Sequence, residues 1–167
     1  MNVQSMFRPA SVLLLASAAA FVLVAAGTKP ADAGIIDSVG TWEGSGTAQD
    51  VSGSDVGPFT VSVTRKSAGP NKLRTDGKVI LESGREIVFW QEMEEKGARG
   101  FSLVTNKGAG GGQCFSNGMC QSYEQTQGGH AFATTLVKDG TDKVRILVTE
   151  LDGGRAVRFF QQSLTRK

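Results

Sequence analysis

The chain has 167 residues, 40% of them hydrophobic and 20% charged, and a formal net charge of +2. This length predicts a single domain. The basic residues are scattered along the sequence rather than gathered into a stripe, which argues against a nucleic-acid-binding face and against recruitment to anionic membrane surfaces.

Residues 1–33 have the three-part layout of a secretory signal peptide. A basic start is followed by an uncharged apolar run at 11–26 and by Ala31-Asp32-Ala33, which matches the A-x-A cleavage pattern. A permanent membrane anchor is the alternative, but an alanine-rich run of 16 residues falls short of the roughly 20 that a spanning helix needs. We therefore expect cleavage after Ala33 and a periplasmic or secreted protein, with residues 34–167 forming the folded domain.

After residue 33 the sequence alternates short runs of β-branched and aromatic residues with turn signals. The clearest run, 59–64, places Phe59, Val61 and Val63 on one face of a strand. Further strands are expected at 78–81, 86–93, 101–105, 121–124, 131–137, 144–151 and 156–164, with shorter pieces near Trp42 and Leu73. The segment 47–58 is the most loop-like stretch between them.

Eight to ten strands joined by tight hairpins predict an antiparallel meander, and closure into a barrel protects its two edges. A transmembrane barrel would carry aromatic girdles, whereas this chain has one tyrosine and two tryptophans. The fold class predicted is therefore all-β, a single antiparallel up-and-down β-barrel of about 8–10 strands with inward apolar faces. We do not expect an integral membrane protein once the signal peptide is removed.

Trp42, Gly44 and Gly46 share one strand face, so a large side chain is followed by two missing ones. The segment 39–47, with its G-x-W and W-x-G-x-G patterns, resembles the first strand of bacterial lipocalin-like (calycin) barrels in the nitrobindin neighbourhood. The resemblance covers residues 40–167. It implies that Trp42 closes the floor of the barrel.

The resemblance also implies that an arginine of the last strand, Arg158 or Arg166, stacks on that tryptophan. In nitrobindin-type barrels a histidine near the C-terminus binds haem iron. The only histidine of this chain, His130, precedes a middle strand, so that function does not carry over. We expect His130 to be a solvated or capping residue.

Cys114 and Cys120 are the only cysteines, and an exported chain meets oxidising conditions, which predicts a disulfide between them. In the chain-entropy model such a short ring stabilises the fold by about 2.4 kcal/mol, so it would stiffen one loop rather than hold the core. The glycine run at 108–112 lacks the lysine and the following helix of a phosphate-binding loop. We interpret the run as a flexible loop.

The sequence contains no GxSxG, HExxH or GxxxxGK[ST] motif, and one histidine cannot build a metal cluster without nearby carboxylates. We therefore predict no enzyme activity, no cofactor and no metal.

Two non-enzymatic functions remain open. In the first, the barrel carries a small apolar ligand that enters at the end carrying the cysteines. The candidate lining residues are Trp42, Phe59, Val61, Phe89, Phe101, Phe132 and Phe159. The alternative is that these side chains fill the barrel and leave no cavity. In the second function, the disulfide-tied loop 108–121 contacts another envelope protein through Phe115 and Met119.

Overall fold

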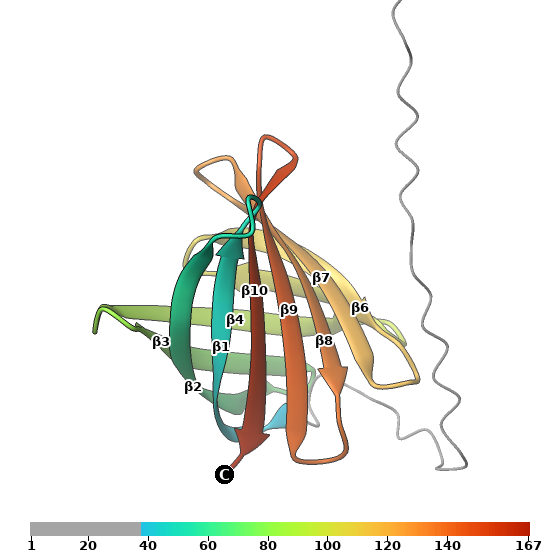
Figure 1. Ribbon diagram of the computed structural model, residues 1–167. Coiled ribbons are helices and arrows are strands. Elements are labelled where there is room, and N and C mark those ends of the chain that lie inside the picture. The colour runs from blue at the N-terminus through green and yellow to red at the C-terminus, as the bar shows by residue number, and fades with distance from the viewer. Residues whose placement is uncertain (1–37) are drawn as a thin grey trace, which may run out of the picture.

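Ten antiparallel strands joined by short turns make up residues 38–167, the part of the chain that the computed structural model describes (Figure 1). They are β1 (Gly40–Asp50), β2 (Asp55–Gly69), β3 (Lys72–Leu81), β4 (Glu86–Lys96), β5 (Gly100–Thr105), β6 (Gly108–Cys114), β7 (Met119–Thr126), β8 (His130–Lys138), β9 (Lys143–Asp152) and β10 (Arg155–Arg166). Each strand pairs with the next in the chain, and β1 pairs with β10, so the sheet is a closed barrel. The predicted fold class is confirmed.

The expected signal peptide, residues 1–33, and its cleavage point lie outside the described residues. Within residues 38–167, no helix has the length and apolarity needed to cross a membrane.

The segment 47–58, expected to be a loop, is mostly strand. β1 runs on to Asp50 and β2 begins at Asp55, so only residues 51–54 turn. The Asp50 carboxylate holds this turn by accepting hydrogen bonds from the backbone N–H groups of Ser52 and Ser54, at 2.9 and 3.1 Å. The serine, aspartate and glycine content that suggested a long loop therefore serves one tight turn.

The glycine run 108–112 is strand β6 rather than a flexible loop. A Cβ built on Gly108, Gly110 or Gly112 would lie 1.8–2.2 Å from a carbonyl oxygen of β7. Only glycine allows the two backbones to approach so closely. The glycine content that suggested a flexible loop is therefore required for the close packing of β6 on β7.

The same close approach occurs on β1, where a Cβ on Gly44 would lie 1.8 Å from the carbonyl oxygen of Ser163 on β10. β1 and β6 occupy opposite positions in the ring of ten strands. Glycines at such places let the wall of a barrel bend sharply. In Figure 1 the strands β9 and β10 in front cross β3 and β4 behind them at a steep angle.

Trp42 closes one end of the barrel, as the resemblance implied. Its side chain is 2% exposed, and its Nε1 donates a hydrogen bond to the carbonyl of Ser38 at 2.9 Å. The guanidinium of Arg166 lies 5.9 Å from the Trp42 ring and donates to the carbonyl of Val39. Of the two candidate arginines, Arg166 is therefore the one that packs on the tryptophan, while Arg158 lies elsewhere.

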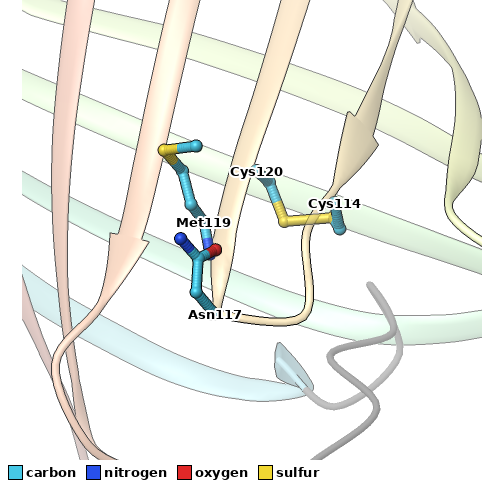
Figure 2. Close-up of a disulfide and its surroundings, with 4 residues drawn as sticks. All are labelled: Cys114, Asn117, Met119 and Cys120. Atoms are coloured by element: carbon cyan, nitrogen blue, oxygen red, sulfur yellow. A yellow bond between two sulfur atoms is a disulfide. The ribbon is translucent and has the colours of Figure 1, made fainter. Parts of the chain in front are cut away.

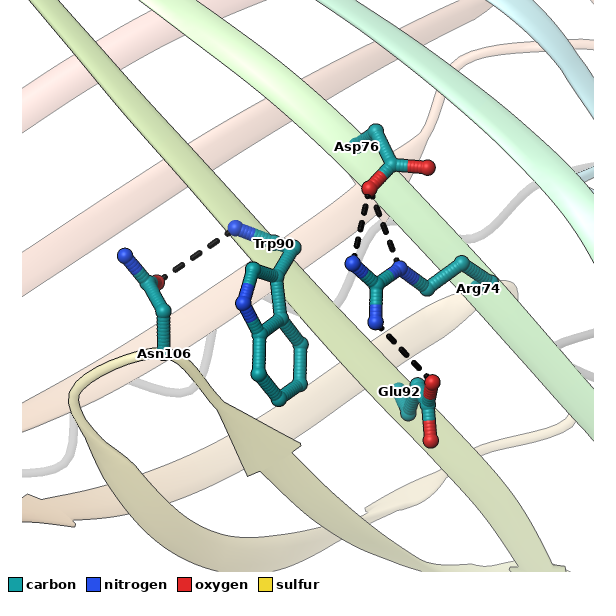
Figure 3. Close-up of polar contacts among 5 residues, drawn as sticks. All are labelled: Arg74, Asp76, Trp90, Glu92 and Asn106. Carbon is teal, nitrogen blue, oxygen red and sulfur yellow. Dashed lines mark hydrogen bonds and ion pairs between the residues drawn. The ribbon is translucent and has the colours of Figure 1, made fainter.

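On the outer wall, Arg74 of β3 is held by two carboxylates and an aromatic ring of β3 and β4 (Figure 3). Its guanidinium contacts Asp76 at 3.0 Å and Glu92 at 2.9 Å, and it lies 4.3 Å from the centre of the Trp90 ring. One cation is shared by two carboxylates, so the cluster carries one net negative charge. The cluster therefore ties two neighbouring strands together.

Candidate ligand-binding cavity

Three inward phenylalanines each face a glycine across a strand ladder. The pairs are Phe59–Gly46, Phe89–Gly77 and Phe101–Gly112. A Cβ on any of these glycines would lie 2.2–2.5 Å from the nearest atom of the opposing ring. Each ring therefore lies against the neighbouring strand, in the space left by the missing side chain, instead of projecting into the lumen.

Because its largest side chains cover the wall, the barrel is hollow. The lumen holds a cavity of about 940 Å³, at the upper end of the range of small-molecule sites. Its apolar wall includes Phe59, Val61, Phe89, Phe101, Leu103 and Phe132. The alternative of a filled barrel is wrong for this chain.

The cavity opens at one end of the barrel. Its exposed lining residues include Val56, Glu82 and Arg85, and they lie beside the β1–β2 and β3–β4 turns. At the opposite end, Trp42 and Leu73 are at most 2% exposed and form the floor. In Figure 1 the β1–β2 turn is at the top and the C-terminus is at the bottom.

Most of the side chains proposed from sequence to line a cavity do so. Those that line it are Phe59, Val61, Phe89, Phe101 and Phe132. Trp42 is buried in the floor below them, and Phe159 lies on the outer surface, 45% exposed. Because neighbouring residues of a strand face opposite sides, only one of the adjacent Phe159 and Phe160 can point inward. It is Phe160, which shares its face with Leu164 and meets Phe59 edge-on at 6.4 Å between ring centres.

The polar part of the lining was not identified from the sequence. Arg65, Thr75, Gln91 and Thr105 are partners in register across β2, β3, β4 and β5, and all four line the cavity. Arg65 lies near the floor end of β2, and Thr105 is the last residue of β5, at the open end. Since the strands of a barrel tilt, this polar row climbs from floor to mouth. One signal could have identified Arg65. It follows Phe59, Val61 and Val63 at a spacing of two residues, which places it on the same face of the strand.

Arg65 is the one cation of this row, and it is only 6% exposed. Burial lowers the pKa of its guanidinium to about 10, so the group still carries its charge at neutral pH. Its ring contact is with Trp42, whose centre lies 5.8 Å away.

Charged side chains gather around the mouth. The Glu150 carboxylate accepts a hydrogen bond from Arg158 at 3.2 Å, and its other oxygen lies 3.4 Å from Nδ1 of His130. Glu124 accepts a hydrogen bond from the hydroxyl of Thr105. His130, expected to be solvated or capping, is 44% exposed in its side chain and belongs to this rim.

The predicted disulfide joins Cys114 and Cys120, which are directly opposite each other across the β6–β7 ladder (Figure 2). Cys114 is 5% exposed and packs against Leu73 and Phe101. The bond therefore ties two strands at the floor rather than stiffening an exposed loop. The expectation that a ligand enters at this end is wrong, because buried side chains close it.

Between the two cysteines the chain makes a tight hairpin. The backbone N–H of Phe115 donates to the carbonyl of Met119 at 2.7 Å, and the N–H of Met119 donates to the Asn117 side chain at 3.1 Å. Phe115 and Met119, the expected anchors of a contact surface, are both half-buried here.

A closed antiparallel barrel with a tryptophan floor and a hollow interior is a lipocalin-like architecture. No protein-family model matches this chain, and no curated protein sequence matches it. Several solved structures match its fold. The S-type phycobiliprotein lyase CPES from Guillardia theta has a TM-score of 0.63 and 9% identity, over 78% of this chain and 89% of that one.

Two further structures have the same fold. The protein Rv2717c from M. tuberculosis has a TM-score of 0.60 and 11% identity, over 78% of this chain and 93% of that one. A protein of unknown function of the DUF3598 family from Nostoc punctiforme has a TM-score of 0.62 and 12% identity; the match covers 78% of this chain but 48% of that protein. At these identities the likeness shows the fold alone.

Proposed function

We propose that this protein binds a small apolar molecule in the lumen of its barrel, without chemical conversion, and that it does so outside the cytoplasm. The observation that carries the proposal is the cavity of about 940 Å³. Its phenylalanines lie on the wall and leave the centre open, whereas a barrel that needs only stability would fill its interior.

Contacts among the charged and polar groups at the mouth support the proposal of a formed entrance to the cavity. Glu150 is engaged by Arg158 and lies beside His130, and Glu124 is engaged by Thr105. Carboxylates held in this way are suited to shape and stabilise a rim.

The location outside the cytoplasm is supported by the disulfide, since such bonds persist in oxidising compartments. The N-terminal sequence, with its signal-peptide layout, points the same way.

Titration with the uncharged fluorescent probe N-phenyl-1-naphthylamine tests the proposal. We expect one binding site on the wild type, and displacement of the probe by a lipid extract of the source cells. Phe132→Asp places a charge in the cavity wall and should weaken probe binding at least about 10-fold, because burying an unpaired carboxylate is costly.

Phe159→Asp is the matched control. It makes the same substitution two strands away, on the outer surface of β10, where the side chain is 45% exposed, and should leave binding unchanged. Circular dichroism establishes that both variants are folded. A folded wild type that binds no probe, or equal effects of the two substitutions, would contradict the proposal.

A further inference from the structure

The deep end of the cavity holds a buried positive charge. Arg65 is 6% exposed, and its Nε atom has no hydrogen-bond partner among residues 38–167. Burial alone accounts for the shift of its pKa, with no contribution from any carboxylate of residues 38–167. Its one aromatic contact, with Trp42 at 5.8 Å, offers a ring face but no hydrogen-bond acceptor along the guanidinium edge.

A second polar group without a partner lies beside this charge. Thr75 is paired in register with Arg65 across β2 and β3, and both residues line the cavity. The Thr75 side chain is 1% exposed, and within the described part of the chain its hydroxyl oxygen also has no hydrogen-bond partner. Buried polar atoms in folded proteins are nearly always paired, so two neighbouring exceptions on one cavity wall indicate an acceptor that residues 38–167 do not supply, such as a bound ligand.

The chemistry of the two groups defines that acceptor. A guanidinium presents parallel N–H donors that fit the two oxygens of a carboxylate, and a hydroxyl can donate a further hydrogen bond to the same group. Arg65 is the only charged side chain that is buried among residues 38–167, and one carboxylate matches its charge. The surrounding wall, built from Phe59, Val63 and Phe101, suits an apolar body attached to the anion.

We propose that the ligand is an amphipathic monocarboxylate whose head group binds Arg65 and Thr75 at the floor of the cavity and whose apolar body lies between the phenylalanines above them. This inference rests on the proposed function, in that it requires the lumen to hold a ligand. It adds the polarity of that ligand and its direction of insertion, carboxylate first.

The polar row explains how a charged head group reaches the floor of an apolar cavity. Gln91 and Thr105 continue the register of Arg65 and Thr75 toward the mouth. Arg85 and Lys107 lie in the lining at the mouth itself. The mouth lining also holds Glu82, Glu124 and Glu150, so its charge is of mixed sign. A carboxylate that enters beside Arg85 and Lys107 then meets amide and hydroxyl groups along one side of the wall, and finally the guanidinium.

The test compares dodecanoic acid with its methyl ester as displacers of N-phenyl-1-naphthylamine at neutral pH. The two molecules have the same apolar chain and differ in the charge of the head group. On the wild type, the acid should displace the probe at a concentration at least about 10-fold lower than the ester, as a charge-assisted pair in a buried site requires. On Arg65→Met the acid should lose this advantage.

Two further variants separate the floor from the mouth. Arg85→Met removes an exposed cation of the cavity lining and should keep the preference for the acid. Arg65→Lys keeps the charge without the planar fork and should give an intermediate preference. If Arg65→Met does not fold, the acid-to-ester ratio on the wild type and on Arg85→Met decides the question.

The two proposals fail in different ways. If the probe binds but the acid and the ester compete equally on the wild type, the monocarboxylate inference is overturned while the lumen remains a binding site. A preference for the acid that survives Arg65→Met, or that is lost in Arg85→Met, also overturns it. If the probe does not bind at all, the proposed function itself fails.

Discussion

The ring of Phe101 occupies the space that a side chain at Gly112 would take, and the two residues face each other across the β5–β6 ladder. Phe89 and Gly77 repeat the relationship on β3 and β4. In each pair the missing side chain of the glycine leaves room for the ring against the wall. Because the ring lies there, the centre of the barrel stays open. The hollow interior is therefore a property of residue pairs on neighbouring strands.

Gly112→Ala should destabilise the barrel by about 1–3 kcal/mol, because the added Cβ lies 2.2 Å from a backbone oxygen of β7 and 2.5 Å from the Phe101 ring. Urea unfolding measures the change in the free energy of unfolding. Gly128→Ala is the control, since its Cβ meets nothing nearer than 4.0 Å. Equal losses in the two variants would show that the close approach is not what requires glycine.

Trp42→Ala should cost about 3–5 kcal/mol in the free energy of unfolding, as expected for a large side chain removed from a buried floor. In a Trp90→Phe background, the fluorescence of Trp42 alone should be blue-shifted, since its side chain is 2% exposed. An emission maximum typical of tryptophan in water would contradict the position of Trp42 in the floor.

Replacing Cys114 and Cys120 together by alanine should leave the barrel folded and lower its free energy of unfolding by about 2.4 kcal/mol, the chain-entropy value for so short a ring. Native protein should show no free thiol on alkylation before reduction. The reduced wild type should unfold at the same urea concentration as the double variant. Global unfolding of either at low urea would mean that the bond does more than join β6 to β7.

Arg65→Met should stabilise the empty barrel by about 1–4 kcal/mol, because it removes a buried charge without a carboxylate partner among residues 38–167. The pKa of Arg65 is lowered to about 10 in the folded state and keeps its higher ordinary value in the unfolded chain. At alkaline pH the unfolded chain therefore holds more protons, and wild-type stability rises as the folded arginine loses its charge.

The difference in the free energy of unfolding between Arg65→Met and the wild type should accordingly be constant around neutral pH and shrink as the pH rises through 10. Chemical denaturation of both proteins at a series of pH values gives the difference directly, and the other groups that titrate there cancel in it. A variant less stable than the wild type at neutral pH would place a counter-charge beside Arg65.

Export predicts a defined N-terminus. Protein isolated from its own cells should begin at Gly34, since the A-x-A pattern ends at Ala33. Edman sequencing or intact mass measures this. An intact Met1 in the membrane fraction would contradict cleavage.

The barrel could be predicted from sequence because strand alternation is a local signal. Phe59, Val61 and Val63 mark an inward face by their spacing alone. The Cys114–Cys120 bond followed from composition, with the qualification that it lies across a ladder at the floor and not in a loop. These features depend on residues close together in the chain.

The features that were missed depend on register between strands. The glycines of 108–112 look flexible until β7 is placed beside them, and Phe159 looks like a lining residue until the position of Leu164 fixes which side of β10 faces in. Arg65 and Thr75 become a site only when β2 and β3 are aligned. Register joins residues that no local pattern connects.

The hydrogen bond from Arg166 to the carbonyl of Val39 spans 127 residues of sequence. This bond lies at the seam where β1 pairs with β10. All other strand pairings within residues 38–167 join strands that are consecutive in the chain, so hairpins can assemble one after another as the chain lengthens. The β1–β10 seam cannot form until the last strand has been synthesised, because its closure brings together the two ends of the domain. We therefore expect folding of this barrel to be completed by β10, and removal of that strand to leave β1 and β9 as unpaired edges.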